Sequence, residues 1–186
     1  MLDATLLILA GGASRRMGRP KALLPVGGTT MVEWIAGRLG QQFAEVLVSA
    51  NEADLAPGGL QRVPDLRPGL GPLAGIEAGL AAAVHDALVV VACDLPRVTP
   101  EVARLLYERS RGHDAAVARV GGRPQPACAC YWRSALGAVQ AALDTYRLKV
   151  AEVLEELDVG WVEGLDPELF WNINTPEDYQ VFLSAL

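Results

Sequence analysis

Short apolar runs alternate with longer stretches of helical periodicity along this chain. The strand-like runs cover residues 5–10, 45–49, 60–63, 87–93 and 159–162. Residues 87–93 are the clearest, because all seven are apolar, as expected for a strand covered on both faces. Apolar residues make up 51% of the 186, enough for the core of one domain. The pattern predicts a layered α/β domain with a largely parallel sheet.

Capping signals mark three helix starts. Thr30 and Glu33 form a capping-box pattern, while Thr99-Pro100-Glu101 and Thr175-Pro176-Glu177 place a threonine ahead of proline in the first turn. We therefore expect helices from residues 30 and 99, and a final helix from 175 to about 184. Further helices are expected over residues 73–84, 134–143 and 151–157, and further strands over 114–120 and 127–132.

Charge limits the classes of partner. Sixteen Lys and Arg against 22 Asp and Glu give a formal charge of −6, which disfavours nucleic acid and anionic membranes. No apolar run approaches the roughly 20 residues of a membrane span. The first residues carry Asp3 in place of a basic segment, and the apolar run 6–10 is too short for a signal peptide. We expect a cytoplasmic protein with no membrane partner.

The cysteines and histidines give no sign of a catalytic thiol or a zinc site. Cys93, Cys128 and Cys130 match no common zinc spacing, and the sequence favours buried free thiols. His85 and His113 adjoin no candidate nucleophile, so a serine or cysteine hydrolase has little support.

Polar residues come directly after the predicted parallel strands. A glycine-rich loop over residues 11–20 comes after the first strand, Asn51 after the second, Asp65 after the third and Asp94 after the fourth. Four of the 16 basic residues lie close together here: Arg15, Arg16, Arg19 and Lys21. Ligands of open parallel sheets bind beyond the carboxyl ends of the strands, so this edge is a candidate phosphate site. The alternatives are a solvated arginine-rich loop and aspartates that only cap turns.

The chemistry of these groups suits a nucleotide. Glycines let backbone N–H groups approach phosphate oxygens, Arg and Lys neutralise them, and Asp94 can share Mg²⁺ with a substrate phosphate. The loop matches neither the Walker A pattern nor GxGxxG. A different nucleotide-binding solution is required.

Several blocks in order resemble the MobA-like nucleotidyltransferases, and within them the molybdenum cofactor guanylyltransferases. The blocks are Leu9-Ala10-Gly11-Gly12, Ser14-Arg15-Arg16-Met17-Gly18 with Lys21, Val48-Ser49-Ala50-Asn51, Pro64-Asp65, Gly71-Pro72-Leu73-Ala74-Gly75, Cys93-Asp94-Leu95-Pro96 and Asn172-Ile173-Asn174-Thr175-Pro176-Glu177. They span nearly the whole chain, which makes the resemblance specific for the family.

The resemblance implies a three-layer Rossmann-like nucleotidyltransferase fold (nucleotide-diphospho-sugar transferase-like) with a mostly parallel mixed sheet. It implies transfer of GMP from GTP to molybdenum-molybdopterin, with release of pyrophosphate and Mg²⁺ as cofactor. One domain over residues 1–186 would have a nucleotide-binding half over about 1–100 and an acceptor-binding half over about 101–186. The product would reach molybdoenzymes or their chaperones through transient contacts.

The resemblance also assigns roles by matching position. Lys21, Asp94 and Arg15 would be catalytic, with Asp94 as the metal ligand. The nucleotide would be bound by Leu9, Ala10, Gly11, Gly12, Lys21, Asn51, Asp65, Gly75 and Asp94. Asn172 and Asn174 would face the acceptor.

Alternatives remain for the substrate and for the class. Related cytidylyltransferases tend to carry LAAG in the first loop, so Gly12 favours GTP over CTP. The sequence departs from the family pattern over residues 121–126, where Arg123-Pro124-Gln125-Pro126 is the polar match. Arg147 and Lys149 either meet the acceptor phosphate or form a solvated basic spot. A sugar-phosphate nucleotidyltransferase and a non-catalytic GTP sensor are the other readings.

Overall fold

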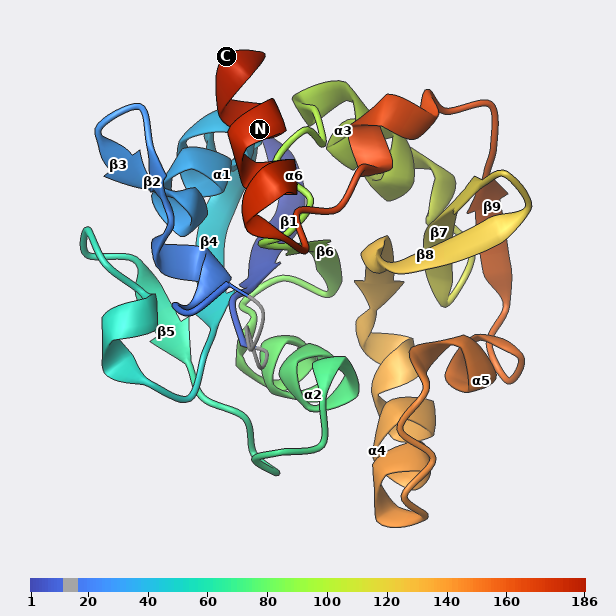
Figure 1. Ribbon diagram of the computed structural model, residues 1–186. Helices are drawn as coiled ribbons and strands as arrows, with labels where there is room; N and C mark the ends of the chain where they lie inside the picture. Colours follow the sequence, from blue (N-terminus) through green and yellow to red (C-terminus); the bar gives the residue numbers. More distant parts are fainter. Residues whose placement is uncertain (12–16) are drawn as a thin grey trace.

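The computed structural model describes residues 1–11 and 17–186, and in this part of the chain a seven-stranded sheet lies between two helical layers (Figure 1). The spatial order of the strands is β5-β4-β1-β6-β8-β7-β9, with β5 on the left of Figure 1 and β9 on the right. They are β1 (Leu2–Leu9), β4 (Phe43–Ser49), β5 (Gln61–Val63), β6 (Ala87–Ala92), β7 (Ala115–Val120), β8 (Arg123–Trp132) and β9 (Val159–Val162).

The sheet is mostly parallel, as predicted. Of its six described strand pairings, β4–β5, β1–β4, β1–β6 and β7–β9 are parallel. Strand β8 runs antiparallel to both of its neighbours, β6 and β7. The carboxyl ends of β5, β4, β1 and β6 therefore share one edge, and the beginning of β8 lies at that same edge.

Helices cover both faces of the sheet. One layer holds α1 (Met31–Leu39), α3 (Pro100–Arg109) and α6 (Pro176–Ser184), and the other holds α2 (Pro72–Ala82), α4 (Leu136–Asp144) and α5 (Val150–Leu154) (Figure 1). Alternate side chains of β1 pack into the two layers: Leu6 and Ile8 into the first, Leu7 and Leu9 into the second. Burial on both faces explains why these strands are apolar throughout and confirms the three-layer arrangement.

The largest difference from the predicted elements is in β8. The strand begins at Arg123 instead of residue 127, because its first residues pair with β7 across a two-glycine turn. Gly121 and Gly122 have φ values of 55° and 76°, which suit a tight hairpin turn. Smaller differences are that β1 and β4 begin three and two residues earlier than predicted and that α5 ends at Leu154 instead of 157.

The capping signals are confirmed. Thr30 and Glu33 form the predicted box, and the Thr99 side chain accepts a hydrogen bond from the Val102 N–H. At the last helix the box partner of Thr175 is Asp178.

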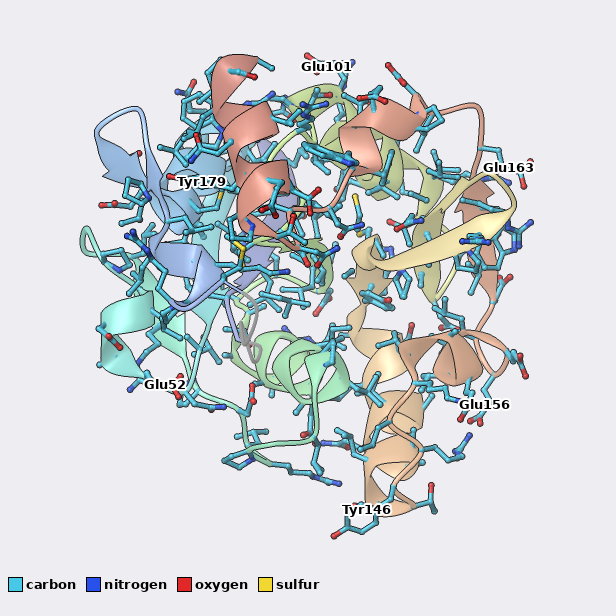
Figure 2. All side chains as sticks on the ribbon, viewed as in Figure 1. Glu52, Glu101, Tyr146, Glu156, Glu163 and Tyr179 are labelled. Atoms are coloured by element: carbon cyan, nitrogen blue, oxygen red, sulfur yellow. The ribbon has the colours of Figure 1, made fainter. Side chains whose placement is uncertain are left out.

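Sequence patterns missed a small hairpin, β2 (Pro25–Val26) with β3 (Thr29–Thr30). Strands of two residues are too short to show the alternation of apolar and polar side chains from which a strand is predicted. The Tyr179 hydroxyl, on α6, donates to the Pro25 carbonyl and ties the last helix to this hairpin (Figure 2).

The three cysteines are buried free thiols, as predicted. Burial raises the pKa of each thiol to about 12, so none is a thiolate at neutral pH. Among the described residues, no helix has the length and apolar character needed to cross a membrane.

Candidate active site

The ends of β1, β4 and β6 are tied together at the carboxyl edge of the sheet. The Ala10 N–H donates to the Ser49 carbonyl and the Cys93 N–H donates to the Leu9 carbonyl, both at 3.0 Å. Leu9 and Ala10 are buried, and Gly11 is the first exposed residue after the strand. The parallel strands thus bring the segments that leave their carboxyl ends to one edge.

Gly12 and Arg15, both predicted at the site, lie outside the described residues, as do Ala13, Ser14 and Arg16.

Three predicted site residues from distant parts of the sequence are in contact at this edge. The Lys21 ammonium donates to Asp94 Oδ2 at 3.2 Å and to Asn174 Oδ1 at 2.8 Å. The side chains of Lys21 and Asp94 are 18% and 26% exposed, so the pair is shielded but reachable by a ligand. An ammonium beside a carboxylate at a rim of this kind can meet both phosphate and metal charge.

Local structure explains the convergence. Asp94 lies just beyond the end of β6, and Lys21 begins the short 3₁₀ turn Lys21–Leu23. The Ile173 N–H donates to the Asp94 carbonyl at 3.0 Å, which brings the C-terminal segment to the same place.

Asn174 is held from the other side by α6. Its backbone N–H donates to Asp178 Oδ2 at 2.9 Å, and this hydrogen bond is the main reason that the pKa of Asp178 is lowered. The capping box therefore fixes the backbone from which the Asn174 amide reaches Lys21.

Asn51 and Asp65 form a second pair at the edge. The Asn51 amide donates to Asp65 Oδ2 at 2.9 Å, and the Asp65 N–H donates to Asn51 Oδ1 at 3.0 Å. The reciprocal bonds hold the carboxylate and the amide in one orientation, which is the preorganisation that recognition of hydroxyl or N–H groups requires.

Sequence reasoning missed two residues that support this pair. The Arg62 guanidinium donates to the carbonyls of Ala50 and Asn51 at 3.2 and 3.0 Å, and the Ser49 hydroxyl donates to Asp65 Oδ1 at 3.5 Å. The one available signal was a buried polar residue, Ser49, closing an apolar strand.

Gly75 lies buried in α2 against the strand ends. A Cβ on this residue would come within 2.5 Å of Ser49 Oγ and 2.9 Å of Leu9 Cδ2. The missing side chain therefore lets α2 approach β1 and β4 closely.

The Asn172 amide donates to the Phe170 carbonyl at 3.3 Å, so it bonds within its own segment and does not join the Lys21 contact.

The basic residues considered for the acceptor differ in their partners. Arg147 is paired with Glu156, which follows α5, and Lys149 is paired with Glu152 of α5 at 3.1 Å. Arg123 is exposed at the start of β8 and has no ion pair with another described residue. These pairs favour the interpretation that Arg147 and Lys149 form a solvated basic spot and do not meet the acceptor phosphate.

The described residues contain no group of three or more His, Cys, Asp and Glu side chains placed to hold a metal ion. Asp94 therefore offers a single carboxylate to a metal ion at this rim. That donor set fits Mg²⁺, which is commonly bound by one or two carboxylates together with substrate phosphates and water.

A hollow of about 600 Å³ lies at the opposite edge, lined by Asp86, Gly112, His113, Trp132, Arg133 and Ser134. Arg133 there donates to the carbonyls of Leu80, Ala83 and His85. The Arg133 donors therefore hydrogen-bond to backbone carbonyls of the protein itself, and we do not assign the site to this hollow.

Residues 6–159 match the family model described as the MobA-like NTP transferase domain. The chain is 45% identical to a "Probable molybdenum cofactor guanylyltransferase" from Pelotomaculum thermopropionicum, over 96% of this chain and 91% of the relative. It is 40% identical to a "Molybdenum cofactor guanylyltransferase" from Cereibacter sphaeroides, over 92% and 91%.

Solved structures agree with this similarity. The crystal structure of molybdopterin-guanine dinucleotide biosynthesis protein A from Archaeoglobus fulgidus is 28% identical, with a TM-score of 0.83 over 97% of both chains. A Thermus thermophilus 2-C-methyl-D-erythritol 4-phosphate cytidylyltransferase, 24% identical with a TM-score of 0.74 over 97% of both chains, shares the fold. The strand order, the edge at which the polar side chains gather and these relatives agree, and the chain belongs to the MobA-like NTP transferase family of nucleotidyltransferases.

Proposed function

We propose that this chain transfers GMP from GTP to the phosphate of molybdenum-molybdopterin and releases pyrophosphate. The observation that carries the proposal is the Lys21–Asp94–Asn174 contact at the carboxyl edge, in a chain similar over nearly its full length to guanylyltransferases. Family membership supports the reaction class, and the charges at the edge support a polyphosphate substrate.

The proposed reaction is an in-line displacement. An acceptor phosphate oxygen forms a bond to the α-phosphorus of GTP, and the bond to the bridging oxygen breaks, so that pyrophosphate leaves with the electron pair. Both reactants are anions, so neutralising charge and positioning supply most of the acceleration. A phosphate nucleophile needs no general base.

Each residue of the candidate site would have its own role in this reaction. Lys21 would stabilise the departing pyrophosphate, together with Arg15 and the backbone amides of Gly11 and Gly12, because the Ala10 N–H already donates to the Ser49 carbonyl. Asn51 and Asp65 would bind the nucleoside, and Gly75 would allow the close packing behind it. Asp94 would hold Mg²⁺, which supplies positive charge to the phosphate oxygens when bound.

The two halves of the domain would serve the two substrates. Residues 1–100 would bind the nucleotide and residues 101–186 the acceptor, with Asn172 and Asn174 facing the pterin. The names of the relatives support molybdopterin as the acceptor. The product would pass to molybdoenzymes or their chaperones in the cytoplasm.

The test is incubation with GTP, Mg²⁺ and molybdenum-loaded molybdopterin, with the dinucleotide measured by mass and pyrophosphate by coupled assay. We expect both products in equal amounts, and none when Mg²⁺ is removed by a chelator. Tight GTP binding without pyrophosphate release would indicate a sensor and overturn the proposal.

Parallel reactions with CTP and with sugar phosphates address the other enzymatic readings. We expect GTP to be preferred by at least about tenfold in kcat/KM, because a site built to hydrogen-bond one base leaves polar groups unpaired with another. A preference for CTP would make the chain a cytidylyltransferase.

A further inference from the structure

Helix α2 carries a buried carboxylate that the proposed reaction does not use. The Glu77 side chain is 1% exposed, and its Oε2 has no hydrogen-bond partner among the described residues. Gly75 and Gly79 face the sheet, where added Cβ atoms would meet side chains of β1, β4 and β6. Glu77 lies between them in sequence and so projects from the other side of the helix. Burial of a carboxylate is costly unless a partner compensates it.

The partner is Arg67, which joins three parts of the chain. Its Nε lies 3.4 Å from Glu77 Oε1, and its Nη1 donates to Asp144 Oδ1 at 2.5 Å. Asp144 is the last residue of α4, near Tyr146 at the tip of the molecule labelled in Figure 2. Figure 1 shows the segment that carries Arg67 running from β5, below α2, to the start of that helix.

This segment, residues 64–71, also carries Asp65. It contains no helix or strand, and Leu66 between the two polar residues is 61% exposed. Asp65 is bonded to Asn51 on one side, and Arg67 is paired with Glu77 on the other. Leu70 packs against the core, and the exposed remainder of the segment takes its position from such polar anchors.

We propose that Glu77 is a positioning residue: through Arg67 it fixes the segment 64–71 and so aims the Asp65 carboxylate at the bound nucleotide. The inference rests on the proposed function, because it takes Asp65 as a nucleotide ligand. Glu77 itself touches no substrate. A buried ion pair is a weak source of stability, since a well-packed apolar pair of similar size is often equally stable. The charge is therefore retained for the geometry that it imposes on Arg67.

The test replaces the pair without leaving an unpaired buried charge, because Asp144, the other partner of Arg67, is 65% exposed. In the double variant Glu77→Leu/Arg67→Met, we expect the KM for GTP to rise about tenfold while kcat stays within about twofold, the signature of lost nucleotide positioning. The melting temperature should not fall. Glu77→Gln keeps an acceptor for the Arg67 N–H and should bind GTP within about threefold of wild type.

Arg111→Met is the matched control, because it removes an arginine that stacks on Tyr107 at the end of α3. It should leave the KM for GTP unchanged. Calorimetric titration of each protein with GTP, without acceptor, gives the same comparison when no transfer occurs. If the wild-type protein shows no transfer, the proposed function is wrong. A lower GTP affinity of the double variant than of the wild type would still support the positioning role. Equal GTP affinity of the double variant and wild type would overturn it, as would a loss confined to the melting temperature.

Discussion

The two edges of the sheet use polar side chains in different ways. At the carboxyl edge the predicted site residues bond to one another, as in Lys21–Asp94 and Asn51–Asp65, while Arg62 beside them donates to backbone carbonyls. At the amino edge Arg133 donates to three backbone carbonyls around the end of α2 and pairs with Asp86 at 2.7 Å.

The Glu45 carboxylate at the amino edge also serves the backbone. It accepts from the Val84 N–H at 3.0 Å and from the buried Thr5 hydroxyl at 2.7 Å. A side chain that satisfies the protein's own backbone is part of its stability, because the backbone group has no other partner. Side chains paired with one another can exchange that partner for a ligand. Side-chain pairs occur at both edges, and the carboxyl edge is the better candidate for chemistry because it gathers an ammonium, carboxylates and amides that bond to one another.

The largest effect we expect is a difference in turnover between variants of the two edges. Lys21→Ala and Asp94→Ala should each lower kcat about 10²–10³-fold, since each removes one electrostatic contact to the reacting phosphates. Circular dichroism should show unchanged folding. Asp86→Ala, at the amino edge, is the control and should keep its turnover. Near-normal turnover in both site variants would remove the assignment of chemistry to the carboxyl edge.

For stability we expect the opposite result, with the larger loss in a variant of the amino edge. Arg133→Met leaves three carbonyls without their donor and should lower the free energy of unfolding by about 3 kcal/mol. The measurement is urea unfolding, with kcat recorded at a temperature where the variant is folded. A large loss of kcat per folded molecule would show that the amino edge also takes part in catalysis.

Two glycines on the same face of α2 sharpen the comparison. Gly75 packs against Leu9 and Ser49, while a Cβ at Gly79 would come within 2.5 Å of Leu7 Cδ2, further from the carboxyl edge. Either change to alanine overpacks the core and should cost about 2 kcal/mol. Gly75→Ala should in addition raise the KM for GTP, because it displaces the strand ends behind the proposed nucleotide site.

Gly37→Ala is the control for both glycine variants. Gly37 lies in α1, and a Cβ there meets nothing within 4 Å. Alanine should stabilise the protein by about 0.5–1 kcal/mol through the lower entropy of the unfolded chain. Equal KM values for Gly75→Ala and Gly79→Ala would contradict the difference drawn between them.

The smallest effect we expect is on the free energy of unfolding at acidic pH. The Ser134 hydroxyl and then the Asp158 N–H lower the pKa of Asp114 below its ordinary value of 3.8. A lowered folded pKa means that this stabilisation is complete above the unfolded value and is lost as the pH falls below it through the folded pKa. Ser134→Ala should therefore flatten the fall in unfolding free energy between about pH 5 and pH 3, measured by urea unfolding at each pH. An unchanged slope would mean that the bond is not formed in solution.

Much of the structure of residues 1–100 was predictable because its strands are parallel. Strands β1 and β6 are buried on both faces and read as apolar runs, so the residues just beyond their ends can be assigned to one edge. Asn51, Asp65 and Asp94 were found in this way, and their convergence at that edge is a consequence of strand direction alone.

The contacts across long sequence separations were not predictable in the same way. The structure brings Asn174 onto Lys21, 153 residues away, and Arg67 between Glu77 and Asp144. Nothing in the local patterns around Glu77 distinguishes a buried carboxylate from a solvated one. The extension of β8 was missed for a similar reason, since its first residues are exposed and carry two prolines.

The sequence by itself determined the alternation of elements, the helix caps and the polar residues that end each strand, because local periodicity and turn chemistry depend on neighbours along the chain. Tertiary structure alone decided which charged side chains became partners and which glycines let α2 pack closely against the sheet. Those outcomes depend on the packing of segments that are far apart in sequence, and burial is what gives each of these contacts its energetic weight.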